Sequence, residues 1–171
     1  MKTLHYNVVT PQLLSVLKAC MHEKLFDPFR LVGGTALSLQ RGHRISYDID
    51  LFSDADHGSI DFSEIEKWLT VNFSYVDSNN IKPIGFGKSF FVGNDKNNCV
   101  KIDIYYTDHF IDEPLIIDDI RMATEQEIIA MKADVIFRGQ YPRPPRPFLL
   151  KSASHPFFRL KFVHSWLTSM Y

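Results

Sequence analysis

Residues 47–52 constrain the fold of this 171-residue chain more than any other stretch, because apolar and acidic side chains alternate along them. Successive side chains of a β-strand point to opposite faces. Asp48 and Asp50 would therefore share one face of a strand, while Ile49 and Leu51 would point into a core. Two neighbouring carboxylates repel each other unless a cation lies between them. The stretch predicts a strand with one buried face and one acidic face.

A glycine pair lies shortly before this strand. Residues 29–32 predict a short apolar strand, and residues 35–40 predict a helix that begins directly after Gly33 and Gly34. The free N–H groups of a glycine turn and a helix N-terminus favour an anion such as a phosphate. Thr35 could cap the helix or offer its hydroxyl to the same phosphate. Taken alone, a glycine pair before a helix is more often only a turn.

A third carboxylate could complete a metal site with Asp48 and Asp50. Asp103 lies between apolar neighbours in a predicted strand, where an acid is costly to bury unless it binds something. Oxygen-only ligands suit Mg²⁺ or Mn²⁺, and two such ions about 3.5–4 Å apart can hold the attacking and leaving oxygens of a phosphoryl transfer. Asp48, Asp50 and Asp103 are therefore the candidate metal ligands and catalytic acids. The alternative for an isolated pair of this kind is a solvated strand end.

The remaining pattern predicts an α/β (α+β) fold, with a mixed β-sheet flanked by helices. We expect one domain over residues 1–138 and an atypical Pro/Arg-rich tail over residues 139–171. Cys20 lies on the apolar face of a helix and is expected in the core. The expected helices span residues 10–25, 61–71 and 124–137, and the expected strands span 73–76, 81–86, 89–92 and 100–106.

Composition indicates a globular cytoplasmic protein. No apolar run is long enough for a membrane span, no signal peptide is visible, and two cysteines imply no disulfide framework. Charge is distributed unevenly: residues 1–134 hold 13 Lys and Arg against all 20 Asp and Glu, a net of −7, whereas residues 135–171 hold six basic groups and no acid. An acidic body disfavours non-specific adhesion to nucleic acid. The seven histidines show no ligand spacing, so zinc is not expected.

The order Gly33-Gly34, then Asp48-Ile49-Asp50, then Asp103 resembles the nucleotidyltransferase superfamily, with 13 residues between Gly34 and Asp48. Residues 31–52 resemble more specifically the abortive-infection toxin nucleotidyltransferases of the AbiEii/AbiGii type. The resemblance extends over about residues 28–138. It implies Mg²⁺-dependent transfer of a nucleoside monophosphate from an NTP to an acceptor, either RNA (typically tRNA) or a protein, and a possible antitoxin partner.

The resemblance also implies a role for each matching residue. Asp48, Asp50 and Asp103 would bind the metal ions, and Asp103 could help to deprotonate the acceptor hydroxyl. Arg44 and Ser46 could reach phosphate oxygens, although a surface loop is the alternative for Arg44. The residues that would hold the nucleotide are Gly33, Gly34, Thr35, Arg44, Ser46 and Lys132, with a solvated helix lysine as the alternative for the last.

The sequence departs from the family after Asp134, where related proteins carry further acidic residues that help to form the site. We expect that a frameshift or an unusual terminus replaced the ordinary C-terminal helices. Two other functions therefore stay open. One is a catalytically impaired remnant that keeps the fold and some nucleotide or antitoxin binding, and the other is a metal-dependent phosphodiesterase that uses water as its nucleophile.

Overall fold

The computed structural model describes residues 3–78 and 86–140. The chain divides into two units, residues 1–125 and 126–171. The described part of the second unit consists of helix α4 (Glu125–Gln140), which begins on the last residue of the first unit and matches the helix predicted over 124–137. Most of the predicted tail lies outside the described residues, so the domain boundary at residue 138 stays a prediction.

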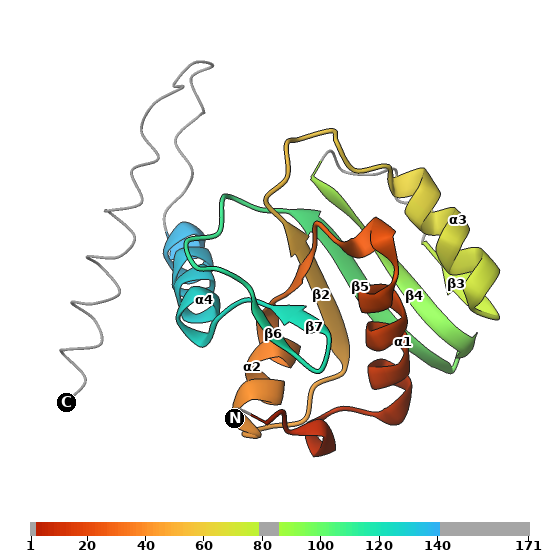
Figure 1. The fold of residues 1–171 in the computed structure, drawn as a ribbon, viewed down its shortest axis with the longest axis horizontal. Helices are drawn as coiled ribbons and strands as arrows, with labels where there is room; N and C mark the ends of the chain where they lie inside the picture. The colour runs from red at the N-terminus through yellow and green to blue at the C-terminus, as the bar shows by residue number, and fades with distance from the viewer. Residues whose placement is uncertain (1–2, 79–85, 141–171) are drawn as a thin grey trace. The chain divides into compact units, whose positions relative to one another are not determined.

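The first unit is built on one mixed sheet of seven strands in the order β3-β4-β5-β2-β1-β7-β6 (Figure 1). The pairs β2–β5 and β1–β7 are parallel, and the other neighbours are antiparallel. This arrangement confirms the predicted mixed sheet with flanking helices. The strands are β1 (Arg30–Leu31), β2 (Asp48–Ser53), β3 (Tyr75–Asp77), β4 (Gly87–Asp95), β5 (Asn98–Tyr106), β6 (Leu115–Ile117) and β7 (Ile120–Met122).

One face of the central strands forms the core. Ile49 and Leu51 of β2 and Ile102 of β5 are fully buried, as the alternation predicted. Helices α1 (Pro11–His22) and α3 (Phe62–Asn72) cover this face, and Phe26 contacts Trp68 of α3 edge-on, with 5.4 Å between ring centroids. Burial of one such side chain stabilises the fold by about 1.5–3 kcal/mol. The opposite face of β2 and β5 is left to the polar side chains.

The helix ends follow the local sequence. The Thr10 hydroxyl accepts a hydrogen bond from the Leu13 N–H at 3.1 Å and caps α1, as its Thr-Pro start predicted. Asp61 caps α3 in the same way. Helix α2 (Gly33–Arg41) includes both glycines in its first turn and ends at Gly42, whose φ of 65° closes the helix. Cys20 is fully buried in α1, as predicted.

One predicted strand cannot be checked, and one observed pair of strands was not predicted. The strand predicted over 81–86 falls almost entirely outside the described residues. The hairpin of β6 and β7 has no counterpart among the predicted elements, because Asp118 and Asp119 form its turn at φ values of 51° and 64°. Such a turn is usually recognised in a sequence by glycine or asparagine, whereas here two aspartates adopt the left-handed conformation.

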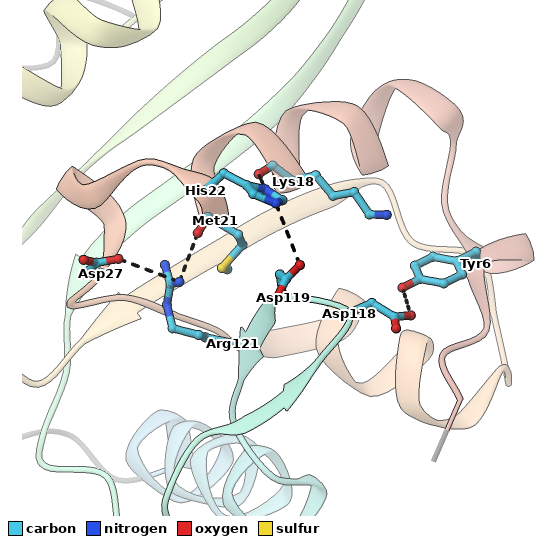
Figure 2. Close-up of polar contacts among 8 residues, drawn as sticks. All are labelled: Tyr6, Lys18, Met21, His22, Asp27, Asp118, Asp119 and Arg121. Carbon is cyan, nitrogen blue, oxygen red and sulfur yellow. Dashed lines mark hydrogen bonds and ion pairs between the residues drawn. The ribbon is translucent and has the colours of Figure 1, made fainter. Parts of the chain in front are cut away.

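Polar contacts tie this hairpin to the N-terminal segment (Figure 2). Arg121 of β7 donates to the backbone oxygens of Met21 at 3.0 Å and Phe26 at 2.9 Å, and lies 3.8 Å from an Asp27 carboxylate oxygen. The Tyr6 hydroxyl donates to Asp118 at 2.5 Å. Burial and this carboxylate raise the pKa of Tyr6 to about 12. None of the helices in the described part of the chain has the length and apolar character that crossing a membrane requires.

Candidate active site

The predicted acidic residues meet where β2 and β5 run side by side. In this parallel pair Asp50 lies directly opposite Asp103, and Asp48 lies opposite Lys101. Residues two apart on a strand share a face, so these four side chains lie on the same side of the sheet. The intervening residues, such as Ile49 and Ile102, are buried on the other side. The register thus brings together the three carboxylates that were predicted from the sequence as metal ligands.

Asp103 is held by two neighbours on this polar face, and a third residue bonds to one of them. The Ser89 hydroxyl donates to Asp103 Oδ1 at 2.6 Å, and the Lys101 ammonium donates to Oδ2 at 2.7 Å. Because the Ser89 proton goes to the carboxylate, the Tyr105 hydroxyl is the donor in its 3.1 Å contact with Ser89 Oγ. Ser89 lies opposite Asp103 in the antiparallel β4–β5 pair. Both oxygens of Asp103 are thereby fixed by groups of the sheet itself.

Lys101 is a member of the site that sequence reasoning missed. Its hydrogen bond to Asp103 raises the pKa of the ammonium, and the charges of Asp103, Asp48 and Asp50 act in the same direction against partial burial. All three carboxylates therefore act electrostatically on one ammonium. The signal was present in the sequence, because Lys101 and Asp103 are two residues apart on a predicted strand.

Gly33 is the residue of α2 that meets the carboxylates. It adopts a φ of 69°, and a Cβ atom built on it would overlap Asp50 Oδ2. Only glycine combines that conformation with so close an approach. The first turn of a helix has N–H groups without partners inside the helix. The Asp50 carboxylate and the N-terminus of α2 are therefore parts of one site.

The next residue, Gly34, lies against the loop that precedes β2. A Cβ atom on Gly34 would approach Arg44 Nη2 to 2.5 Å and Ser46 Oγ to 3.5 Å. A guanidinium beside a helix N-terminus adds a second kind of anion donor to the N–H groups. The structure thus places Arg44 and Ser46 beside Gly34, and their predicted contact with phosphate oxygens stays a prediction.

Thr35 has a structural position in the same region. Its side chain is buried, its hydroxyl donates to the Asp48 backbone oxygen, and it lies 2.8 Å from Ser46 Oγ. Because the Thr35 proton goes to the carbonyl, Ser46 is the donor between the two hydroxyls. These bonds fix the start of β2 against α2. The hydroxyl is therefore engaged within the protein, so the predicted bond from this hydroxyl to a phosphate would have to replace one of these contacts.

The last predicted nucleotide-binding residue is Lys132. It lies on α4 in the second unit with an exposed side chain, and its role stays a prediction.

A cavity of about 780 Å³ lies elsewhere in the first unit. Its lining includes Gln12 of α1, Asn98 and Cys99 of β5, and Tyr47, but none of the predicted site residues. The acidic face of β2 and β5 is thus separate from this cavity.

Comparison with known protein families matches residues 15–147 to one described as the nucleotidyl transferase AbiEii toxin of type IV toxin–antitoxin systems. The match covers well over half of the chain. The chain belongs to the AbiEii family. The family resemblance and the nucleotidyltransferase fold predicted from the sequence are thereby confirmed.

Solved structures agree with this assignment to the AbiEii family. A protein from H. pylori described as a candidate nucleotidyltransferase is 26% identical, with a TM-score of 0.52, over 75% of this chain and 60% of its own. The fold of JHP933 from Helicobacter pylori is also similar, with 23% identity and a TM-score of 0.54, over 79% of this chain and 62% of its own. The AbiEii chain described here therefore spans about three fifths of these neighbours. Comparison with curated proteins gave no match.

The carboxylates of this AbiEii chain have the donor chemistry that a divalent cation prefers, and the strand register places them on one face. Asp48, Asp50 and Asp103 offer only oxygen donors, as Mg²⁺ prefers, and they project from adjacent positions of one face. Within the described residues, no three acidic, histidine or cysteine side chains are arranged as a ready metal cluster. Lys101 Nζ lies 2.7 Å from Asp103 Oδ2, an oxygen that a metal bound by this carboxylate would use.

Proposed function

We propose that this protein is a Mg²⁺-dependent nucleotidyltransferase of toxin type, which transfers a nucleoside monophosphate from an NTP to an RNA or protein acceptor. One observation carries the proposal: Asp50 lies opposite Asp103 across β2 and β5 while its carboxylate lies against Gly33 at the N-terminus of α2. A carboxylate cluster beside an anion-binding helix end is what a metal–triphosphate complex requires.

The nucleotide would bind through its phosphates at the start of α2. The N–H groups of Gly33, Gly34 and Thr35 would donate to phosphate oxygens, and the absence of side chains on the glycines allows a close approach. Arg44, whose guanidinium lies beside Gly34, would add charge-assisted bonds to the same phosphates. Ser46 would act through its hydrogen bond to Thr35, which fixes this loop against the helix.

The carboxylates would act at the reacting end of the nucleotide. Asp48, Asp50 and Asp103 would hold Mg²⁺, which when bound neutralises charge on the phosphates and on the leaving group. The acceptor hydroxyl oxygen would form a bond to the α-phosphorus as the bond to the pyrophosphate oxygen breaks. The proton of the acceptor hydroxyl would pass to Asp103, and pyrophosphate would leave.

The acceptor class follows from the family rather than from a feature of this surface. We favour RNA, typically tRNA, with a protein acceptor as the other candidate. Residues 1–134 carry a net charge of −7, so a polynucleotide would need local basic groups such as Arg44 to bind. The family description names a type IV toxin–antitoxin system, which implies an antitoxin partner. NTP and tRNA would both be met in the cytoplasm.

Transfer of label tests the proposal directly. The full chain would be incubated with each of the four [α-³²P]NTPs, Mg²⁺ and either total tRNA or cell protein. Label that appears on an acceptor, and is lost in Asp50→Asn, would support transfer. Release of labelled monophosphate without transfer would favour the phosphodiesterase, and NTP binding with neither reaction would favour the impaired remnant.

A further inference from the structure

We propose that Lys101 is a positioning residue: its ammonium is a built-in counter-ion that holds Asp103 in the metal-free protein and must release it when a divalent cation binds. This inference rests on the proposed function, because it assumes that the three carboxylates form a metal site. It adds to that site a residue whose charge opposes the metal.

The position of Lys101 carries the inference. Its Nζ atom donates to Asp103 Oδ2 at 2.7 Å, and its strand position lies directly opposite Asp48. The side chain thus lies on the acidic face, paired with Asp103 and on the strand position opposite Asp48. A single ammonium in this place offsets the repulsion that clustered carboxylates exert on one another.

The same position sets up a competition. A cation bound by Asp48, Asp50 and Asp103 would need the oxygen that Lys101 now occupies. Two positive groups a few ångströms apart repel each other, and partial burial weakens the screening by water. The ammonium must therefore move away from Asp103 as the cation arrives. Loss of the ammonium should accordingly tighten metal binding and should destabilise the metal-free protein.

The surroundings allow that movement. The Lys101 side chain is 38% exposed, whereas that of Asp103 is 19% exposed. A long side chain at the edge of solvent can change rotamer while the backbone register of β5 stays fixed. Ser89, which holds the other oxygen of Asp103, keeps that carboxylate oriented during the exchange.

The sheet also offers a matched control. Lys88 of β4 forms an ion pair with Glu66 of α3 at 2.5 Å, and its side chain is 13% exposed. Lys88 lies opposite Ile104, which points to the helix-covered face, so its ammonium is on the other side of the sheet from the carboxylates. A methionine at either position removes one paired ammonium from a strand of the same sheet.

The experiment measures Mn²⁺ binding by electron paramagnetic resonance for the full-length wild type, Lys101→Met, Lys101→Arg, Lys88→Met and Asp50→Asn. We expect Lys101→Met to bind Mn²⁺ about tenfold more tightly than wild type, with Lys101→Arg and Lys88→Met close to wild type. In EDTA, Lys101→Met should melt several degrees below wild type, and Mn²⁺ should raise its melting temperature more.

The outcomes separate this inference from the proposed function. Mn²⁺ binding that needs Asp50 but is unchanged or weaker in Lys101→Met would overturn the role of Lys101 alone. No Mn²⁺ binding by any of the proteins, or binding that Asp50→Asn leaves intact, would overturn the metal site and the counter-ion together. Binding by Lys101→Met where wild type shows none would support the inference in its strongest form.

A measurement on the wild type removes dependence on the folding of a variant. Side-chain ammonium signals of Lys101 and Lys88 would be followed by ¹⁵N NMR during a Mg²⁺ titration. We expect the Lys101 signal to be visible without metal and to broaden or shift with Mg²⁺, while the Lys88 signal stays unchanged. A Lys101 signal that does not respond, in a sample where Mg²⁺ binds, would contradict the inference.

Discussion

Asp50 and Asp103 lie opposite each other across the parallel strands β2 and β5, although 52 residues separate them in the sequence. This pairing turns two distant acids into one cluster. The first half of that cluster is tied to α2 through Gly33, where the Asp50 carboxylate occupies the space of a side chain. The geometry of the site thus depends on a few backbone positions, which the following variants address.

Replacement of Gly33 by alanine should disrupt the site and the fold together. The new Cβ would overlap the Asp50 carboxylate, and a φ of 69° is strained for alanine. We expect a loss of about 1–3 kcal/mol in the free energy of unfolding. Gly58→Ala is the matched control, because Gly58 also has a positive φ, 91°, but no atom lies near its Cβ position. Equal losses in both variants, measured by urea denaturation, would contradict the close approach to Asp50.

The Thr35 hydroxyl should matter for stability, because it is buried and bonded to Asp48 O and Ser46 Oγ. Thr35→Val keeps the shape but leaves these groups without the hydroxyl, which should cost about 1–3 kcal/mol. Thr35→Ser keeps the hydroxyl and should lose less. Urea denaturation of the two variants checks this, and a valine variant as stable as wild type would show that the bonds contribute little.

Arg121 should stabilise the first unit far more than an exposed arginine does. Its guanidinium donates to the Met21 carbonyl (Figure 2) and to the Phe26 carbonyl. Hydrogen bonds from a charged group contribute about 1.5–3 kcal/mol each, so Arg121→Met should lose about 3 kcal/mol. Arg41→Met, which removes a 59% exposed side chain paired with Glu125, should lose at most about 1 kcal/mol. Thermal denaturation measures both variants, and similar losses of stability in Arg121→Met and Arg41→Met would contradict this prediction.

Cys20 should make stability fall at high pH. Burial raises the pKa of its thiol to about 12, whereas a thiol in the unfolded chain ionises near about 8.5. Between these values the unfolded state binds fewer protons than the folded state, so the free energy of unfolding falls as pH rises, by up to about 1.4 kcal/mol per pH unit. The contribution of this thiol is complete below the unfolded pKa and is lost as pH rises towards the folded pKa.

Urea denaturation between pH 8 and 10.5 measures this slope. Cys20→Ala should be less stable at every pH because it leaves a small cavity, but its stability should decline less steeply. Cys99→Ala is the control, since Cys99 is only partly buried. Parallel slopes for wild type and Cys20→Ala would contradict the assignment of the pH dependence to this thiol.

The predictable parts of the fold are those that local chemistry encodes. Three features have a short-range signature and appear at their expected places: the Thr10-Pro11 helix start, the alternation through Asp48 and Asp50, and the acid at Asp103. The hairpin turn at Asp118 and Asp119 was missed because aspartate seldom adopts a left-handed conformation in succession. Its two strands are also only three residues long.

The sequence predicts which acidic residues share a face of one strand, but it does not predict which residues of different strands lie opposite each other. The pairing of Asp50 with Asp103 needs the parallel register of β2 and β5, which no local signal specifies. Ser89 reaches Asp103 through the register of the β4–β5 hairpin, which contains an irregularity at Gly93. Lys101 was within reach of sequence reasoning, since it shares a face with Asp103.

Calorimetry of nucleotide binding tests the central claim most directly. Each of the four NTPs would be titrated into the full chain with and without Mg²⁺, and into the Asp48→Ala/Asp50→Ala double variant. The account predicts Mg²⁺-dependent binding of at least one NTP that the double variant loses while its melting curve stays cooperative. No NTP binding by the wild type, or equal binding by the double variant, would contradict it.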